Sequence, residues 1–461
     1  MTTSDLETRR TDVRQLVRPG DDGYDDARQG WNLSADQRPA VVALAETEAD
    51  VQAAVRYAAE HGLGVGVMST GHGVTTPCDG GVLVNTSRMR RVRVQPRTRR
   101  ATVEAGARWT DLIPAADAFG LAGLPGSSPH VGVVGYTLGG GFGWLGRAFG
   151  LSAHHVTRAR VVAADGELVV ASRSENADLF WGLRGGTGNF GIVTQLELGL
   201  VAIDEVYAGN LFYPLERATD VLTAFARWAP TTPNELTAAV TFRAFPPVPA
   251  VPEPLRGKRF VLVRGAYAGS PASGARLVDE VRAVLGPALM DTFGPMRPAH
   301  LGSVSMDPVD PLAAEGHADL LRDITPELTD SLVDLEGPAS PLVMLEMRQI
   351  GGALAGRPGD LSPMAHTSAA YTLNAIGLTP GPEQQRVVRE HLARVAAAVR
   401  PEATGEAYLN FLDAGPGTPA RVDAAYSPTD RARLARVKCR YDPQNVFRFN
   451  RNLTHTEGHP S

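Results

Sequence analysis

The spacing of hydrophobic and polar residues predicts a chain that mixes helices with short strands. Apolar residues three and four positions apart predict helices, whereas alternating or short continuous apolar runs predict strands. The predicted helices cover residues 47–60, 109–120, 177–183 and 428–442, with two further helix faces within 277–285 and 387–399. The predicted strands cover residues 63–68, 82–85, 192–198, 237–244, 260–266, 342–347, 371–376 and 408–411, with hairpins at 91–104 and 160–171.

Signals at the ends of these segments support the helices. Thr47 is suited to cap the first one, with Asp50 three residues later as its capping-box partner. Pro428 follows Ser427 at the preferred first helical position, and Pro443 ends that helix. The elements do not alternate as regular βαβ units, so the predicted fold class is α+β. Composition shifts divide the chain into residues 1–204, 205–400 and 401–461.

Charge and composition exclude several classes of protein. A net charge of −5 argues against a nucleic-acid partner, which a basic surface would be needed to bind. Two cysteines, Cys78 and Cys439, cannot form a disulfide framework, and the polar start at residues 1–12 does not look like a secretory leader. Residues 118–146 lack Asp, Glu, Lys and Arg, but their ten glycines do not suit a membrane span. We expect a cytoplasmic protein without a membrane partner; its oligomeric state stays open.

Glycine is concentrated in one stretch, where 11 of the 33 residues from Ala118 to Gly150 are glycine. Two G-x-G-x-x-G matches begin at Gly141 and Gly186. The second has a helix before it and a strand after it, the reverse of a dinucleotide-binding unit. The first allows an NAD(P)-dependent dehydrogenase, with residues 131–138 as the strand and Asp165 as the ribose-binding acid. The remaining interpretations are a phosphate-binding loop built from backbone N–H groups, or simple tight turns.

A longer set of motifs resembles a known family. In chain order they are Ser69-Thr-Gly71-His72-Gly73, Cys78-Asp-Gly-Gly81, Gly126-Ser-Ser-Pro129, residues 137–145, residues 178–193, Tyr408-Leu-Asn410-Phe411 and residues 437–447. Together they resemble the berberine bridge enzyme-like FAD-linked oxidases of the vanillyl-alcohol oxidase superfamily, which have a PCMH-type FAD-binding fold. The resemblance covers about residues 16–200 and 405–453 and is loose in between.

This resemblance implies a bipartite FAD domain, formed by residues 1–204 and 401–461, around a substrate domain at 205–400. The antiparallel sheet of the substrate domain would cover the flavin. FAD would be attached through an 8α-histidyl bond at His72, where a neutral ring nitrogen can act as the nucleophile. The family's second link, through cysteine, would fall at Ser128, so we expect no cysteinyl bond. The residues implied to contact FAD are Ser69, Thr70, Gly71, His72, Gly73, Gly126, Ser127, Ser128, Gly132, Gly139, Gly140, Gly141, Gly143, Gly191, Ile192, Val193 and Asn410.

The resemblance also implies the catalytic residues. Flavin carries out the redox step, and the protein orients the substrate and moves protons. Tyr408, in a strand, is the candidate for the proton-accepting or supporting group. Tyr371 is a second candidate, but its spacing from Asn374 on one strand places the two on opposite faces, so only one can point into the pocket. Glu346 and Arg348 share a strand face and form either a pocket ion pair or, our preferred interpretation, a structural one.

Other features are interpreted without a functional role. His154 and His155 lack neighbouring carboxylates or cysteines at ligand spacing, so we expect no metal site. Trp144 and Trp181 are expected in the core. The basic residues of the last predicted helix are expected to form a solvated surface; they are Arg431, Arg433, Arg436, Lys438 and Arg440.

The sequence thus predicts an FAD-dependent oxidase that oxidises a small organic substrate, such as a secondary-metabolite intermediate. Its electrons would pass to O2, which would leave as H2O2. The alternatives are a flavin mono-oxygenase of the same fold, an NAD(P)-dependent dehydrogenase, and a flavin-free binding protein.

Overall fold

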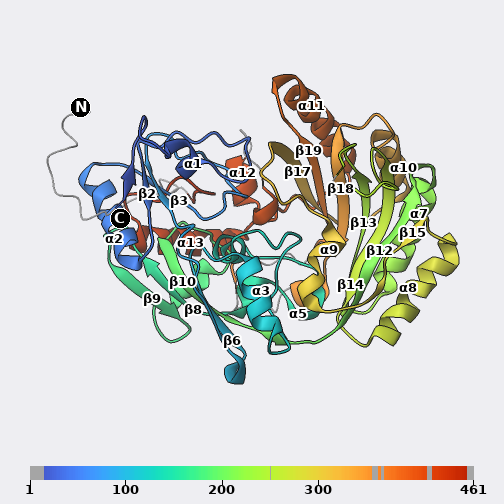
Figure 1. Ribbon diagram of the computed structural model, residues 1–461, viewed down its shortest axis with the longest axis horizontal. Helices are drawn as coiled ribbons and strands as arrows, with labels where there is room; N and C mark the ends of the chain where they lie inside the picture. The colour runs from blue at the N-terminus through green and yellow to red at the C-terminus, as the bar shows by residue number, and fades with distance from the viewer. Residues whose placement is uncertain (1–14, 250, 356–361, 365–367, 413–417, 454–461) are drawn as a thin grey trace.

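The protein has two lobes that lie side by side (Figure 1). The computed structural model describes residues 15–249, 251–355, 362–364, 368–412 and 418–453. The prediction that residues 1–12 are not a secretory leader concerns residues outside this description. One lobe holds the N-terminal strands together with the C-terminal helix α13 (Pro428–Tyr441), and the other holds one large sheet. Among the described residues, no helix combines the length and the apolar character needed to cross a membrane.

A four-stranded sheet begins the first lobe, with strand order β1-β2-β4-β3. Its strands are β1 (Leu16–Val17), β2 (Val41–Leu44), β3 (Val65–Met68) and β4 (Val82–Asn85). The short helix α1 (Tyr24–Arg28) and the longer α2 (Glu48–Glu60) follow the first two strands. The predicted capping box is confirmed, because the Thr47 hydroxyl accepts the Asp50 N–H and the Asp50 carboxylate accepts the Thr47 N–H. The fixed helix start buries Val51, Ala54, Val55 and Ala58 against the sheet.

A five-stranded antiparallel sheet of order β5-β6-β10-β8-β9 completes this lobe. It comprises β5 (Val92–Gln95), β6 (Arg100–Glu104), β8 (Val156–Val162), β9 (Leu168–Ser172) and β10 (Ile192–Gly199). Both predicted hairpins are confirmed, as β5-β6 and β8-β9. Around it lie α3 (Trp109–Asp117), α4 (Val133–Leu138), α5 (Gly146–Phe149), α6 (Ala177–Leu183) and the two-strand pair β7 (Leu121–Ala122) and β11 (Val201–Ala202).

The second lobe is an antiparallel sheet whose strands run in the order β15-β12-β14-β13-β18-β19-β17, with β16 also paired to β12. Its strands are β12 (Val206–Pro214), β13 (Leu236–Ala244), β14 (Arg259–Tyr267), β15 (Met290–Asp291), β16 (Gly294–Met296), β17 (Ala314–Leu321), β18 (Leu342–Gln349) and β19 (Tyr371–Leu378). Helices α7 (Ala218–Trp228), α8 (Pro271–Leu285), α10 (Pro326–Leu335) and α11 (Pro382–Val399) pack on one face, with α9 (Gly302–Ser305) on the other side. The α+β class and a sheet flanked by helices are therefore confirmed.

The opposite face of this sheet packs against the glycine-rich stretch of the first lobe. Leu124, Trp144 and Leu145 share one apolar cluster with Val206, Ala239 and neighbouring residues of the sheet. The indole N–H of Trp144 donates to the Ser305 hydroxyl at 2.9 Å, so Trp144 is buried at the junction of the lobes. This junction places the glycine-rich loops directly below the strands β13 and β18.

One prediction about elements is wrong, one alternative lacks the strand that it needs, and one helix face is narrower than predicted. Residues 133–138 form helix α4, and not the strand that the NAD(P)-dependent alternative needs before its glycines. Tyr408 precedes a single 3-10 turn at Leu409–Phe411, so this motif is not a strand. Within the helix face predicted at 277–285, Val278, Val281 and Leu285 of α8 are buried against the sheet, whereas Val284 is 72% exposed.

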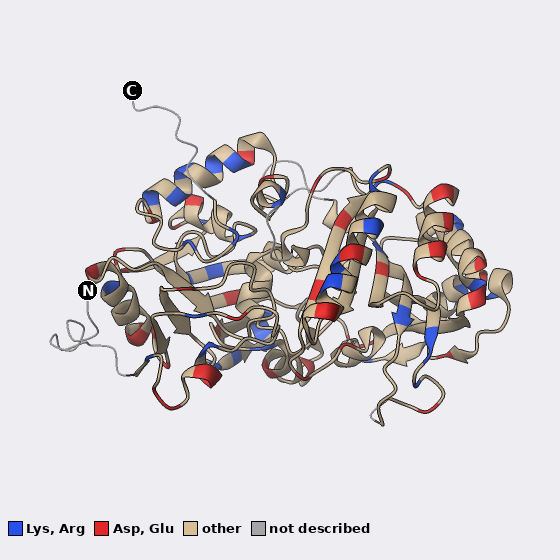
Figure 2. Cartoon of the chain, turned by 90° about the horizontal axis from the view of Figure 1, so that it is seen from above, with Lys and Arg blue, Asp and Glu red and all other residues tan. Residues whose placement is uncertain are grey.

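The basic face of α13, whose residues are seen along the helix in Figure 2, is also only partly solvated. Lys438 is fully buried, and its ammonium group donates to the Asp442 carboxylate at 2.5 Å and to the Phe447 carbonyl at 3.0 Å. Asp442 also accepts the N–H groups of Val446 and Phe447. The pair fixes the segment after α13, whose Val446 carbonyl accepts the Val65 N–H at the start of β3. The domain boundaries that the sequence predicts after residues 204 and 400 stay predictions.

Candidate active site

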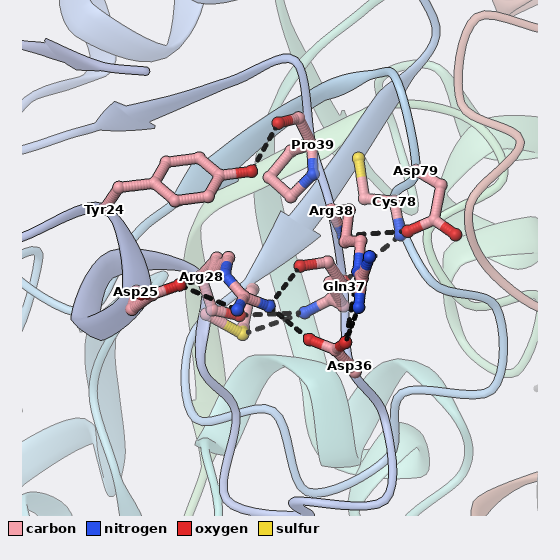
Figure 3. Close-up of polar contacts among 10 residues, drawn as sticks. Tyr24, Asp25, Arg28, Asp36, Gln37, Arg38, Pro39, Cys78 and Asp79 are labelled. Atoms are coloured by element: carbon pink, nitrogen blue, oxygen red, sulfur yellow. Dashed lines mark hydrogen bonds and ion pairs between the residues drawn. The ribbon is translucent and has the colours of Figure 1, made fainter. Parts of the chain in front are cut away.

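The loop that carries His72 leaves β3 at Ser69 and is held at both ends by Gln37. The Gln37 amide N–H contacts the Met68 sulfur at 3.5 Å, and its carbonyl oxygen accepts the Cys78 N–H at 3.4 Å. Figure 3 shows this network, in which the Arg38 N–H also donates to Asp79 at 2.8 Å and Arg28 donates to the Gln37 carbonyl at 2.7 Å. Within the loop, Gly71 has φ +70° and lies against Gly30, so a side chain there would overlap Gly30. The loop is therefore held in place from behind.

His72 is oriented within this loop by two contacts. Its ring stacks on Trp31, with ring centroids 4.5 Å apart and an interplanar angle of 9°. Its Nδ1 lies 2.9 Å from the Thr70 hydroxyl, whereas its Nε2 is buried with no hydrogen-bond partner among the described residues. Burial, assisted by the charges of Arg108 and His130, lowers the pKa of His72 to about 4. The imidazole is therefore neutral at physiological pH and presents one unengaged nitrogen.

Trp31, which sequence reasoning missed, is itself fixed. Its indole N–H donates to the Val309 carbonyl at 2.9 Å, and its backbone N–H donates to the Thr70 carbonyl at 2.8 Å. A lone tryptophan outside any motif gives no sequence signal for this role. The geometry makes it the support on which the His72 ring rests.

The predicted glycine positions lie close to one another and to the His72 loop. A methyl group at Gly132 would lie 3.0 Å from the Ser69 hydroxyl oxygen, so the 126–132 loop runs alongside the 69–73 loop. A side chain at Gly139 would overlap the Asn410 amide, and one at Gly143 would overlap the Pro125 carbonyl. Most of these glycines thus allow one segment of the chain to lie close against another. Among the described residues, a methyl group added at Gly73 would have one neighbour within 4 Å, the Arg451 side chain at 3.7 Å.

The tyrosines Tyr136 and Tyr408 lie in the middle of these glycines. Methyl groups at Gly126 and Gly141 would lie 2.8 and 2.7 Å from the Tyr136 ring, and one at Gly140 would lie 3.3 Å from the Tyr408 ring. The Asn410 amide donates to the Tyr136 carbonyl at 2.9 Å, which ties the Tyr408 segment to α4. Burial raises the pKa of Tyr408, against hydrogen bonds from the backbone of Gly141 and Phe142 and the charge of Arg348. Burial also raises the pKa of Tyr136, so both phenols are protonated at neutral pH.

Tyr136 was not predicted as a site residue. Its hydroxyl is buried and has no hydrogen-bond partner among the described residues, and burial raises its pKa. An aromatic hydroxyl at position 136, directly after the apolar and glycine residues 131–135, is the sequence signal that could have identified it.

The sheet adds a buried cluster of charges above the tyrosines. The guanidinium of Arg348 pairs with Glu346 at 2.6 Å and donates to the Ser127 hydroxyl at 2.9 Å, and it lies 4.0 Å from the centre of the Trp144 ring. Arg264 pairs with the other oxygen of Glu346 at 3.1 Å. The Glu346–Arg348 pair is therefore real, and it joins the sheet to the glycine-rich loop.

Tyr371 is placed differently from the other catalytic candidate. It lies on the helix-covered face of the sheet, 2% exposed, with its ring 6.2 Å from that of Phe225. Its strand partner Gln349 is on that same face, whereas Asn374 pairs with Glu346 and faces the other lobe. The alternation of side chains in β19 thus gives the site-facing position to Asn374, and the interpretation of Tyr371 as a catalytic group does not fit this geometry.

Three further expected positions lie at the edge of this arrangement. Gly191 packs its backbone against β8, where a side chain would lie 2.5 Å from the Val162 carbonyl. Ile192 and Val193 follow at the start of β10 and are buried in two different apolar clusters.

The residues that bear on a second flavin link lie in different places. Ser128 accepts the His130 N–H at 3.3 Å. Cys78 is buried and Cys439 is exposed on α13.

A metal centre has no support in the described part of the chain, where no group of three or more His, Cys, Asp or Glu residues comes together. A separate cavity of about 500 Å³ lies at the start of α2 and contains none of the predicted site residues. Its charged lining includes Glu48 and Arg160, which pair with each other at 2.7 Å.

Comparisons with known proteins identify the family. Residues 39–172 match the model of an FAD binding domain, and residues 407–454 match that of the berberine and berberine-like proteins. The (R)-6-hydroxynicotine oxidase of Paenarthrobacter nicotinovorans is 29% identical over 98% of this chain and 99% of its own length. The solved structure of 6-hydroxy-D-nicotine oxidase from Arthrobacter nicotinovorans has a TM-score of 0.84 at 25% identity, covering 97% of this chain and 99% of that one.

A further structural relative is the glucooligosaccharide oxidase of Acremonium strictum, described with a 6-S-cysteinyl, 8α-N1-histidyl FAD. Its TM-score is 0.79 at 21% identity, over 95% of this chain and 97% of that one, which is a likeness of fold. Together with the two family models, these similarities confirm the expected fold and cofactor-binding family. The chain belongs to the berberine bridge enzyme-like FAD-linked oxidoreductases, which have a PCMH-type FAD-binding fold.

Proposed function

We propose that this enzyme is an oxidase with one covalent bond to FAD, formed by His72, and that it oxidises a small organic substrate with O2 as the electron acceptor. The observation that carries the proposal is the state of His72: a neutral imidazole, held by Trp31 and Thr70, with Nε2 buried and unengaged. A deprotonated ring nitrogen is the form that can bond to carbon. The class of substrate that we propose is an intermediate of secondary metabolism.

The residues present fit FAD. Buried polar atoms in proteins nearly always have a hydrogen-bond partner. Around the proposed site, several buried atoms have none among the described residues, which suits a polar cofactor; they are Ser69 Oγ, His72 Nε2, Tyr136 Oη, Asn450 Oδ1 and Asn452 Oδ1. The loops 69–73 and 126–132, the glycines 139–141 and the segment 450–452 are the parts that would hold it.

Only one histidyl bond is proposed, although a fold relative is described with both histidyl and cysteinyl attachment. The position at which a second link is expected holds Ser128, whose hydroxyl cannot form a thioether. Cys78 is buried, so its thiol is not accessible. Burial also raises the pKa of this thiol to about 12, so it is not ionised. Cys439 is exposed on α13 and does not occupy the motif position of the second link.

The protein residues provide binding and proton transfer. FAD supplies the two-electron oxidation when it is bound, with H2O2 as the product from O2. Oxidation of an alcohol or amine also releases the proton of its O–H or N–H group. Tyr408 is the proposed acceptor of that proton or the donor that orients the reacting atom. The backbone amides of Gly141 and Phe142 hold its oxygen in place.

Acid precipitation of the purified enzyme tests the covalent bond. We expect yellow, fluorescent flavin in the wild-type pellet and a polypeptide heavier by one FAD in mass spectrometry. His72→Ala should give a colourless pellet, with any flavin in the supernatant. His130→Ala, which removes a neighbouring histidine, should keep a yellow pellet and serves as the matched control. A yellow His72→Ala pellet would contradict the assignment, and a colourless wild-type pellet would contradict covalent attachment altogether.

Substrate oxidation is tested by a screen that reads H2O2. One H2O2 released per substrate oxidised is the result expected of an oxidase. Transfer of an oxygen atom from O2 into the product, without H2O2, would instead support the mono-oxygenase alternative.

A further inference from the structure

The buried charges above the tyrosines are not balanced. Three guanidinium groups, those of Arg243, Arg264 and Arg348, act on two carboxylates, Glu346 and Asp307. The three arginines are 9%, 1% and 3% exposed. A buried charge is costly unless it is paired, so an excess positive charge in this place calls for an anion.

Arg348 is the member of the cluster with the most donors to spare, because Arg243 and Arg264 each have only the Nε group buried without a hydrogen-bond partner among the described residues. Its Nη2 serves both Glu346 and Ser127, whereas its Nε and Nη1 are buried with no hydrogen-bond partner among the described residues. Arg264 is more fully engaged, because it donates to Glu346 and to the Val304 carbonyl. Unsatisfied N–H groups of a buried guanidinium require an explanation, and an anionic ligand is the partner that a guanidinium binds best.

The Arg348 guanidinium lies close to the proposed site. Arg348 lies 5.5 Å from the centre of the Phe142 ring, which packs edge-on against Tyr408 with ring centroids 6.3 Å apart. Ser127, which Arg348 holds, follows Gly126, and Gly126 lies against the Tyr136 ring. The charge of Arg348 also acts on both phenols, where it opposes the rise in pKa that burial causes. The guanidinium, the Tyr136 hydroxyl and Tyr408 therefore belong to one neighbourhood.

We propose that Arg348 binds an anionic oxygen of the substrate, with the hydroxyl group of Tyr136 as a second donor. The substrate class is thereby narrowed to molecules that carry a carboxylate or an acidic hydroxyl group. This inference rests on the proposed function in that it places the substrate beside Tyr408. Arg348 then acts as a specificity-determining residue that orients the substrate from the sheet side.

Isothermal titration calorimetry of the purified holoenzyme tests this proposal, because it requires neither turnover nor a chromophore. The probes are pairs that differ in charge and little in shape: benzoate with benzamide, phenylacetate with phenylacetamide, and 4-nitrophenolate with 4-nitroanisole. We expect at least one anion to bind ten-fold or more tightly than its neutral partner. A preference confined to the acids identifies a carboxylate, and one confined to the nitrophenolate pair identifies an acidic hydroxyl. No preference in any pair, or no binding by any anion, overturns the proposal.

Variants separate binding from folding. Arg348→Gln should abolish the anion preference, whereas Arg348→Lys, which keeps the charge, should retain part of it. Glu346→Gln removes the carboxylate that neutralises Arg348 and should strengthen the preference; a merely structural ion pair predicts no such gain. Arg259→Gln is the matched control, because Arg259 pairs with buried Glu336 at 2.9 Å on another part of the sheet lobe. An anion preference that persists in Arg348→Gln overturns the assignment.

The outcome for the proposed function is read separately, from the flavin content and the H2O2 assay. A protein with covalent flavin that oxidises substrates without any anion preference would refute the role of Arg348 alone. Anion binding that depends on Arg348 in a protein lacking flavin would refute the oxidase and leave the anion site standing.

Discussion

At the scale of single residues, the site combines groups whose protonation states are set by burial. His72 is kept neutral, with a pKa of about 4, and the phenols of Tyr136 and Tyr408 are kept protonated by raised pKa values. Each shift has desolvation as its main cause, since a low-dielectric surrounding disfavours the charged form of any group. The same burial thus keeps the imidazole in the neutral form that the proposed bond to FAD requires, and keeps the phenols in the form that donates a hydrogen bond.

Tyr408→Phe tests whether the raised pKa matters in the reaction. If Tyr408 accepts the substrate proton, the rate of flavin reduction should still be rising at pH 10, since only a small fraction of the phenol is ionised below its raised pKa. The substitution should then lower that rate by about 100-fold, the low end for loss of a general base. Anaerobic stopped-flow absorbance from pH 6 to 10 measures both effects.

Phe411 provides the control for this prediction, because it packs edge-on against Tyr408 at a ring distance of 5.0 Å and carries no titratable group. Phe411→Leu should change the rate only modestly and keep the slope of the pH profile. A Tyr408→Phe enzyme with an unchanged rate would remove Tyr408 from the chemistry.

At the scale of elements, the glycines mark where segments approach each other. Gly139 lies at the end of α4, in contact with Asn410 of the Tyr408 segment, and Gly143 lies on the Pro125 carbonyl. These contacts bring three segments together that are distant in sequence: 125–132, 133–143 and 408–411. Their close approach is what positions Tyr136 and Tyr408 as neighbours.

Gly139→Ala should break this arrangement. The added methyl group would overlap the Asn410 amide, and the bond from Asn410 to the Tyr136 carbonyl would be lost. We expect a loss of about 2 kcal/mol in the free energy of unfolding, typical of overpacking combined with a broken buried hydrogen bond. Denaturant unfolding followed by circular dichroism measures this change.

Gly135→Ala is the matched control within the same helix. Gly135 has no atom within 4 Å of an added methyl group, and alanine is favoured over glycine in a helix. We expect this variant to unfold at the same or a slightly higher denaturant concentration. Equal destabilisation by both substitutions would mean that the contact with Asn410 does not fix the segments.

The sequence predicted elements well where the signal was local, and failed where long-range contacts decide. The Thr47 cap and the strand at 82–85 depend on neighbouring residues, and both agree with the structure. The segment 408–411 looks apolar and extended, yet contacts between Asn410 and α4 hold it in a 3-10 turn. Lys438 has the spacing of a surface cation, but its partner Asp442 and the Phe447 carbonyl are supplied by the segment after the helix.

The same limit applies to the candidate site. The His72 loop and the glycine-rich stretch were predictable because their motifs are contiguous. Trp31 reaches the His72 ring from a segment that no local pattern connects to it. The position of Tyr371 was harder to predict, because the face that a strand residue takes depends on the register of the strand. The register of β19 against β18, which pairs Asn374 with Glu346, decides this outcome.

At the scale of the whole molecule, burial of neutral histidines couples stability to pH. The pKa values of His72 and His154 are both lowered to about 4 from the ordinary 6.5, mainly by burial. Well above pH 6.5 these rings are neutral in both the folded and the unfolded chain, so they add little pH dependence there. Between pH 6.5 and 4 only the unfolded chain binds these protons, so the free energy of unfolding falls as the pH is lowered through this window.

Glu346 should extend the loss in the free energy of unfolding to lower pH. Its pKa is lowered in spite of its burial, because the charges of Arg348 and Arg264 oppose the desolvation. A carboxyl with a depressed pKa stabilises the fold above its unfolded pKa, and this contribution is lost as the pH falls through the folded value. We therefore expect the enzyme to lose stability steadily below pH 6.5, with the first part of the loss due to histidine.

His154→Gln isolates one of these contributions. The glutamine oxygen can accept the Leu151 N–H that His154 Nδ1 accepts at 3.3 Å, but it cannot be protonated in this range. Unfolding in guanidinium chloride at pH 7.5, 6 and 5 measures this contribution. Between pH 7.5 and pH 5, the free energy of unfolding should fall by an amount that is of the order of 1 kcal/mol smaller in this variant than in the wild type. The exposed His300→Gln is the control and should follow the wild type. A wild-type stability that stays level from pH 6.5 to 5, or a His154→Gln variant that declines as steeply, would contradict the assignment of acid sensitivity to the buried rings.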